Sequence, residues 1–358
     1  MSQNLKKNDG FTLIELLIVI AIIGVLSAMT LGVIAASADD AKKSRTKVQI
    51  RRVNNLIMDL WESFETRPIP VRIPNFARGP KDAARIRLAA LRELMRLELP
   101  DRYTDITSGP IMIDVDLSTG GIYTVDLQSN SLNAYYQSQL SGVQTVQFQG
   151  AECLYLILSG IQDEFGTGLD SFNDSEIGDV DDDGMMEILD GWGTPIEFLR
   201  WAPGMSELAA DFAAEWTPPP TVPTTGLISP VQSGNGSTDP DPFDPLRADL
   251  RVDPGNSVIK PEDDTFRLVP LIYSAGSDRS YDIWRRDEFD SAFHDFGSGA
   301  TQVVDYTITT VNPLLNDPYF GVGLDNDTTP SVGFRVDWDG DGYDGFIDNV
   351  DNHFGFEQ

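Results

Sequence analysis

The feature that most constrains this chain is a long apolar run near its N-terminus, which follows a ten-residue polar leader containing Lys6 and Lys7. From Phe11 to Ala36 the run contains a single ionisable side chain, Glu15. About 26 residues at roughly 1.5 Å each make a helix of about 39 Å, which exceeds the roughly 30 Å hydrocarbon layer of a bilayer. Length and hydropathy therefore predict a membrane-spanning helix.

Glu15 is the exception within this run, four residues after Phe11. A carboxylate in a membrane helix costs about 2.5–3.5 kcal/mol at the bilayer centre and less near a helix end. Such a residue is usually retained because it pairs with another group. Glu15 is therefore a candidate functional residue.

The order Gly10-Phe11-Thr12-Leu13-Ile14-Glu15 before an apolar run resembles the processing and methylation segment of type IV pilins and type II secretion pseudopilins. The resemblance implies that a prepilin peptidase cuts the bond between Gly10 and Phe11 and methylates the new N-terminus. It also implies that Glu15 pairs with the Phe11 ammonium of a neighbouring subunit during fibre assembly.

Two other interpretations of the N-terminal segment are open. The first is an ordinary single-pass anchor, in which Glu15 has no special role. The second is a secretory signal peptide, because Ala36-Ser37-Ala38 before Asp39 has the small residues of a cleavage site. The apolar run is, however, longer than the roughly 7–15 residues of a signal-peptide core.

We divide the chain into a prepilin leader (1–10), a transmembrane helix (11–36), an amphipathic continuation of that helix (37–66) and an acidic globular domain (67–358). A Pro-rich loop at 217–245 lies within this domain. The resemblance implies a single-pass protein of the inner membrane, with its N-terminus cytoplasmic and its C-terminal domain periplasmic or extracellular, also present in fibres. Basic residues between 42 and 52 do not favour this orientation, but long domains translocate largely regardless of such charge.

Composition limits the classes of partner. The formal net charge of −30 argues against nucleic acid as a ligand of the globular domain. Cys153 is the single cysteine, so an intramolecular disulfide is impossible, and its apolar neighbours predict a buried thiol. With two histidines and one cysteine, we find no catalytic triad or dyad and expect no enzyme.

Hydrophobic periodicity predicts one helix from Phe11 to about Glu65, ended by Pro68 and Pro70. A second amphipathic helix is expected at 81–99, with the side chains of Arg85, Arg92 and Arg96 on a solvated face.

Further along the chain, the pattern predicts a hairpin at 111–125, a short helix at 152–161, a turn that leads into a strand within 192–201, and a strand at 266–273. The fold class we expect is α+β, in which the long N-terminal transmembrane helix packs on an antiparallel sheet. Additional helices and long acidic calcium-binding loops complete this pilin-like expectation.

Two acidic segments have the spacing of calcium-binding loops. In such loops carboxylates at positions one, three and five converge on a cation, a glycine at six permits the turn, and position seven supplies a carbonyl. The first segment predicts as ligands Asp179, Asp181, Asp183, Met185, Glu187 and Asp190. The second predicts Asp337, Asp339, Asp341, Tyr343 and Asp348. We expect structural Ca²⁺ at both.

Two short segments resemble the major pseudopilin of type II secretion systems. They are Asp190-Gly191-Trp192-Gly193-Thr194-Pro195 and Ser274-Ala275-Gly276-Ser277-Asp278, with Asp282 close behind. The resemblance implies a further structural calcium with Ser274, Asp278 and Asp282 as possible ligands.

The function expected is a structural subunit of a type II secretion pseudopilus or a type IV pilus. Its partners would be the prepilin peptidase, other pilin or pseudopilin subunits and the inner-membrane assembly platform. The alternative is a membrane-tethered binding module, or a minor tip subunit, in which the acidic domain recognises a ligand.

Overall fold

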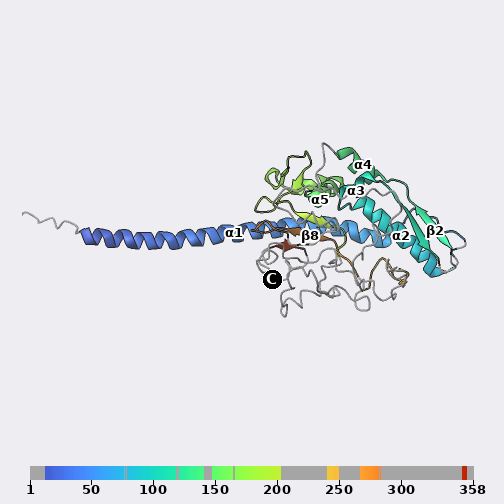
Figure 1. The fold of residues 1–358 in the computed structure, drawn as a ribbon, viewed down its shortest axis with the longest axis horizontal. Helices are drawn as coiled ribbons and strands as arrows, with labels where there is room; N and C mark the ends of the chain where they lie inside the picture. Colours follow the sequence, from blue (N-terminus) through green and yellow to red (C-terminus); the bar gives the residue numbers. More distant parts are fainter. Residues whose placement is uncertain are drawn as a thin grey trace, which may run out of the picture.

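The structure is a computed structural model of the whole chain. It describes residues 13–75, 77, 79–117, 121–140, 147–163, 166–202, 240–249, 267–281, 283 and 349–352. These residues form a mixed helical and antiparallel β structure on one long N-terminal helix (Figure 1). The α+β class predicted from the sequence is confirmed.

Helix α1 (Leu13–Thr66) is continuous over 54 residues, which corresponds to about 81 Å. Its first half projects away from the rest of the molecule, and its second half enters the globular part (Figure 1). The helix ends just before Pro68, because a residue that precedes proline disfavours the helical conformation. The prediction of a single helix through both halves is confirmed.

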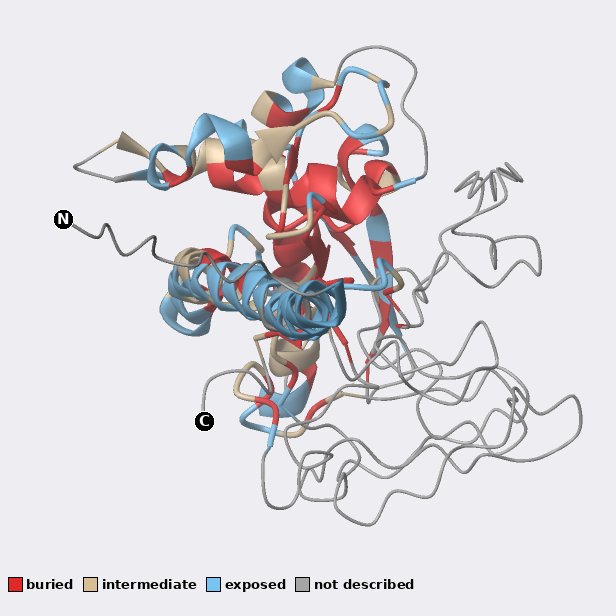
Figure 2. Ribbon diagram, turned by 90° about the vertical axis from the view of Figure 1, so that its left-hand side faces the viewer, coloured by how far each residue is buried: buried red, intermediate tan, exposed pale blue. Residues whose placement is uncertain are grey.

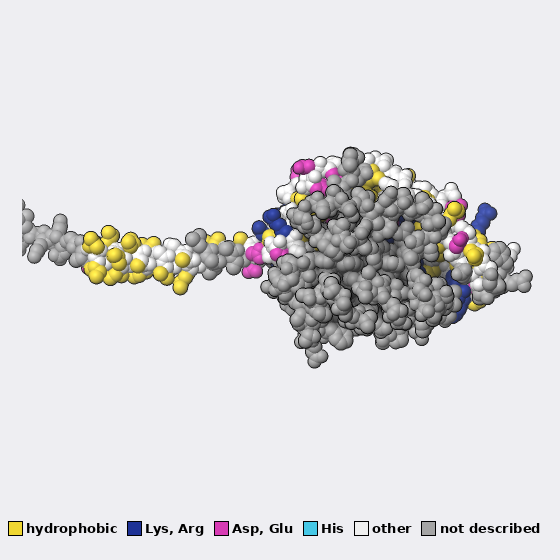
Figure 3. Space-filling model, in the orientation of Figure 1, with side chains coloured by type: hydrophobic (Ala, Val, Ile, Leu, Met, Phe, Trp, Pro, Cys, Tyr) yellow, Lys and Arg dark blue, Asp and Glu magenta, His cyan; other side chains and the backbone are white. Residues whose placement is uncertain are grey.

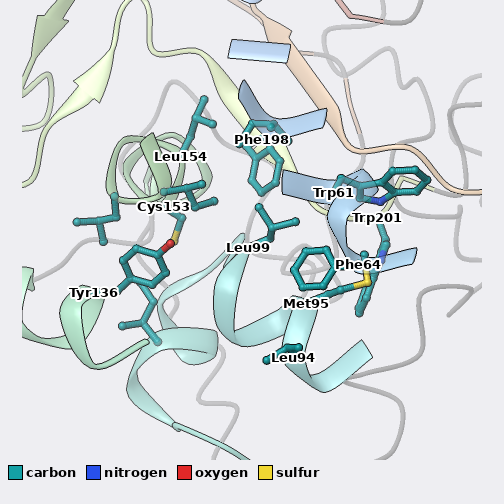
Figure 4. Close-up of a cluster of buried hydrophobic side chains, with 14 of the residues drawn as sticks. Trp61, Phe64, Leu94, Met95, Leu99, Tyr136, Cys153, Leu154, Phe198 and Trp201 are labelled. Carbon is teal, nitrogen blue, oxygen red and sulfur yellow. The ribbon is translucent and has the colours of Figure 1, made fainter. Parts of the chain in front are cut away.

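The second half of α1 supplies one side of the core. Its buried side chains recur at intervals of three and four residues, which places them on one face of the helix: Ile50, Val53, Ile57, Trp61 and Phe64. Figure 4 shows Trp61 and Phe64 of this face in one buried cluster with side chains of α2 (Pro80–Glu98) and α5 (Gln149–Gly160), among them Leu94, Met95 and Cys153, and with Phe198. The thiol of Cys153 is buried as predicted.

The arginines of α2 do not form the solvated face that we predicted. Arg96 is 2% exposed, and its guanidinium donates to both carboxylate oxygens of Glu93 and to the carbonyl oxygen of Gly109. Arg92 lies 2.7 Å from a carboxylate oxygen of Asp249. The prediction was wrong because acidic and carbonyl partners from α2 itself and from distant segments cover this face.

Two shorter helices and a hairpin surround α2. They are α3 (Tyr103–Thr107), α4 (Ser131–Gln139) and the antiparallel pair β1 (Met112–Asp116) and β2 (Ile122–Asp126). The hairpin was predicted from its alternating pattern, and Ile113, Val115 and Val125 face the core. Helix α4 was not predicted.

The remaining strands form three small antiparallel sheets. Two are hairpins, β3 (Gln162–Asp163) with β4 (Gly166–Thr167), and β5 (Ile177–Gly178) with β6 (Glu187–Ile188). The third sheet has the order β7 (Glu197–Leu199), β8 (Leu271–Ser274), β9 (Val350–Asp351).

Helix α1 packs on β8 and β9. In the view along α1, the exposed projecting half faces the viewer and buried residues of the globular part lie beside the helix (Figure 2). Strand β8 begins later than predicted, directly after Pro270, which has no N–H to donate to a neighbouring strand.

Candidate functional site

The projecting half of α1 presents an apolar surface. The segment Leu13–Thr30 is long and apolar enough to cross a membrane, and none of its side chains is buried. Leu13 is 82% exposed and Ile14 is 64% exposed, and hydrophobic side chains cover this part of the helix (Figure 3). A surface of this extent requires lipid or other apolar helices around it.

Glu15 lies in the first turn of α1, where the helix macrodipole favours a negative charge. It stands on the exposed surface of the helix, at its N-terminal end. Gly10 and Phe11 lie outside the described residues. Cleavage at their bond and the pairing of Glu15 with a neighbouring N-terminus therefore stay predictions.

A second region of interest is the neck, which we define as residues 39–52 of α1, directly after the apolar half. The neck contacts η2 (Asp174–Glu176), because the Arg45 guanidinium donates to a Glu176 oxygen at 3.2 Å. Arg52 lies 3.6 Å from the other oxygen of Glu176. Burial would raise the pKa of the Glu176 carboxyl, but hydrogen bonds from Asn173 and Arg45 outweigh burial and lower it.

The neck also contacts the turn that follows β6. The amide of Gln49 donates to the Leu189 carbonyl at 3.0 Å, and the backbone N–H of Gly191 donates to the Thr46 hydroxyl at 2.8 Å. The Trp192 indole donates to Asp39 at 2.8 Å. Polar contacts therefore dock the segment 174–192 on the part of α1 that emerges from the apolar half.

Within this segment, the first predicted calcium loop connects β5 to β6. The carboxylate of Asp179 accepts from the backbone N–H groups of Asp183 and Gly184, and that of Asp183 accepts from Met185. Gly184, at the predicted turn position, has a φ of +95°, which favours glycine. The loop therefore lies in a hairpin, and no helix flanks it directly.

The loop brings together several of the predicted ligands. Oxygens of Asp179, Asp181 and Asp183 lie within 4.8 Å of one another. A second group within the same limit consists of Asp181, Glu187 and Glu152 of α5, which packs on β6. Sequence reasoning missed Glu152, although its position beside the apolar run from Cys153 to Leu158 was a signal. We call these five residues the acidic cluster.

Burial and like charges act on two carboxyl groups of the cluster. Burial raises the pKa of the Glu152 carboxyl to about 10, and the charges of Asp183 and Asp181 add to this effect. Burial raises the pKa of Glu187 to about 8, although a backbone hydrogen bond from Val180 opposes the shift. Glu152 and Glu187 therefore hold their protons more strongly than an exposed glutamate does.

Asp190, the twelfth residue of the predicted loop, uses its carboxylate elsewhere. One oxygen accepts from the backbone N–H groups of Trp192 and Thr194, and the other accepts from the Ser274 hydroxyl at 2.6 Å. Burial raises the pKa of Asp190, and the Ser274 hydrogen bond partly opposes the shift. The structure thus joins the two segments that resemble the major pseudopilin.

The other predicted ligands are placed as follows. Met185 is buried within the first loop, and Asp278 is exposed in the turn after β8. Asp282 and the whole second loop, with Asp337, Asp339, Asp341, Tyr343 and Asp348, lie outside the described residues. The calcium roles of all these residues stay predictions.

Comparison with known proteins finds a similarity in the N-terminal segment. Residues 5–31 match the family model of the prokaryotic N-terminal methylation motif. No curated protein and no solved structure matches the chain. The matched residues contain the Gly10–Phe11 bond and Glu15, and they run through the exposed apolar half of α1. The N-terminal segment of this chain is therefore a methylation motif of the kind found in type IV pilins and pseudopilins.

Proposed function

We propose that the protein is a structural subunit of a type IV pilus or a type II secretion pseudopilus, processed at Gly10–Phe11 and assembled through α1. The observation that carries this proposal is the continuity of α1. The methylation motif opens an exposed apolar helix half, and the same helix becomes the core helix of the globular part. This arrangement favours a structural role over an enzymatic one.

In the assembled fibre, the apolar halves of α1 from many subunits would cover one another. Glu15 would lie in this apolar bundle, where an uncompensated carboxylate is costly. The ammonium of a methylated Phe11 from a neighbouring subunit would neutralise it and would set the axial position of that subunit. The prepilin peptidase, other pilin-type subunits and the inner-membrane assembly platform are the partners that this mechanism needs.

The first prediction concerns Glu15. In Glu15→Ala, the N-terminus begins at methylated Phe11 as in the wild type, but sheared fibres contain no subunit, because the neighbouring ammonium loses its partner. N-terminal sequencing and intact mass report processing, and shearing followed by immunoblotting reports assembly.

The matched control is Glu62→Ala, which removes an exposed carboxylate from the globular half of the same helix and leaves assembly normal. Normal fibres from Glu15→Ala would contradict the proposed role of Glu15. Wild-type protein that is processed but stays in the membrane fraction would support the alternative, a membrane-tethered binding module.

A further inference from the structure

Glu152 is an unusual residue in the core of this protein. Its side chain is 0% exposed, and neither carboxylate oxygen has a hydrogen-bond partner in the part of the chain that the structure describes. Glu187 is also 0% exposed, and its oxygen Oε1 likewise lacks a partner among the described residues. Burying a carboxylate without a compensating group is costly, so buried charges are normally paired or bind a metal.

The groups that face Glu152 make this cost larger. The electrostatic neighbours of its carboxyl are Asp183, Asp181, Glu187 and Glu197, and all four are acidic. Within the described part of the chain, neither Glu152 nor Glu187 forms an ion pair with lysine or arginine. Two buried carboxyl groups, those of Glu152 and Glu187, therefore lie together among other acidic side chains without an ion-pair partner in the described part of the chain.

We propose that the acidic cluster binds one Ca²⁺ ion between helix α5 and the β5–β6 hairpin, with Glu152 as a ligand from outside the loop. The geometry fits this ion. Oxygens of Glu152, Asp181 and Glu187 lie within 4.8 Å of one another. Two oxygens on opposite sides of a Ca²⁺ ion are about 4.6–5.2 Å apart, since each Ca–O distance is about 2.3–2.6 Å.

The chemistry of the donors also favours calcium over other metals. All five side chains supply oxygen, which suits hard cations, and the cluster contains no histidine or cysteine for zinc. Asp179 and Asp183 lie beside Asp181 and can complete a set of six to eight oxygens. Mg²⁺ would require near-ideal octahedral geometry and would keep several waters, which a buried position such as that of Glu152 does not favour.

The site would connect two parts of the molecule that the sequence keeps apart. Glu152 belongs to a core helix that packs on β6 and β7, whereas Asp179, Asp181 and Asp183 belong to the hairpin that docks on the neck of α1. A bound Ca²⁺ would tie the hairpin to the core in a chain that cannot form an intramolecular disulfide.

The test compares the full-length protein, purified in detergent and freed of metal by chelation, with Glu152→Gln. Glutamine preserves the volume and removes the charge. Native mass spectrometry in the presence of Ca²⁺ should show one calcium fewer in the variant. Calorimetric titration should show a loss of at least tenfold in affinity at one site.

The effect of Glu152→Gln on the melting temperature should depend on whether Ca²⁺ is present. Added Ca²⁺ should raise the Tm of the wild type by more than that of the variant. In chelator, Glu152→Gln should melt at or above the wild-type temperature, because it replaces a buried carboxyl group that has no hydrogen-bond partner among the described residues.

Asp182→Asn is the matched control, because Asp182 lies in the same loop, is exposed, and has a φ of +58°, which asparagine tolerates. It should retain the wild-type number of calcium ions. If Glu152→Gln fails to give a cooperative melt in chelator, Asp181→Asn replaces it and should also lose one calcium.

Three results would overturn the proposal: a wild type that binds no calcium, an unchanged number of ions in Glu152→Gln, or an unchanged number in Asp181→Asn. None of these results bears on the Glu15 experiment. Failure of the metal site and failure of the assembly role are therefore distinguishable.

Discussion

Asp105 and Glu152 are both buried carboxylates, but they have opposite surroundings. Asp105 is 4% exposed and lies among the guanidiniums of Arg96, Arg102 and Arg200, with 2.8 Å to Arg200. Burial alone would raise the pKa of Asp105, but Arg200, Arg102 and Arg96 outweigh it and hold the pKa well below its usual range. At Glu152 the neighbours are acidic, so burial and charge act in the same direction.

The Asp105 environment predicts acid sensitivity. The unfolded chain takes up a proton at this carboxyl near pH 4, before the folded protein does, because the folded pKa is lowered. The stabilisation that the ionised Asp105 carboxylate contributes to the folded state is therefore complete above about pH 4 and is lost as the pH falls below this value. Asp105→Asn should lose about 3–5 kcal/mol at pH 7, since it removes a charged partner that three buried guanidiniums share and leaves them with Glu93 and Asp101.

Denaturant unfolding at pH 7 and at decreasing pH measures both effects. The difference between wild type and Asp105→Asn should shrink in acid, as the wild type loses the same interaction. Asp126→Asn, which changes an exposed carboxylate on β2, should cost little at any pH. A constant difference between wild type and Asp105→Asn down to pH 3 would contradict this account.

At the scale of elements, the contact between the neck of α1 and segment 174–192 links the apolar half of α1 to the globular part. Gly191 lies against the helix backbone in this contact. A Cβ added there would lie 2.5 Å from the carbonyl oxygen of Lys42, which belongs to helix backbone and cannot move away alone. The neck contact therefore depends on a position without a side chain.

We expect Gly191→Ala to destabilise the protein by about 1–3 kcal/mol, because overpacking pushes the turn away from α1. Gly24→Ala is the matched change, since an added Cβ at Gly24 meets nothing within 4 Å in the isolated subunit. Thermal melts in detergent should show a lower Tm for Gly191→Ala and an unchanged Tm for Gly24→Ala. Equal melting temperatures would mean that the turn can shift without cost.

Features of the fold that depend on neighbouring residues could be predicted from the sequence, whereas contacts between distant segments could not. Helices α1 and α2 and the β1–β2 hairpin were predictable because their patterns repeat within a few residues. The burial of Arg96 was not, since Asp105 and Gly109 close over it after folding. Likewise, spacing identified Asp179, Asp181 and Asp183, but Glu152 joins them through the packing of α5 on β6.

At the scale of the whole molecule, the main feature is the large excess of acidic over basic residues. The formal net charge is −30, with 56 acidic and 26 basic residues. Mutual repulsion of this kind favours solubility but opposes compactness. Its range shortens with salt, since the Debye length falls from about 30 Å at 0.01 M to about 8 Å at 0.15 M ionic strength.

Salt should therefore stabilise the metal-free protein. Raising NaCl from about 0.01 M to about 0.15 M in chelator should raise the Tm, since screening relieves repulsion among the carboxylates. A gain of about 1 kcal/mol corresponds to about 2–4 °C for a domain of 150–250 residues. KCl at the same ionic strength should give the same shift, and a Tm that stays constant or falls would contradict the prediction.

Because the helix from Leu13 to Thr66 is unbroken, its length also fixes the rotation of the globular part about the helix axis. Each residue turns an α-helix by about 100° and advances it by about 1.5 Å. One residue inserted between the apolar half and the neck would swing the globular part about a quarter-turn around the helix axis. Seven inserted residues would return it to within about 20° of its original azimuth. In the proposed fibre, the number of residues in the apolar half would therefore decide which face each subunit turns toward its neighbours.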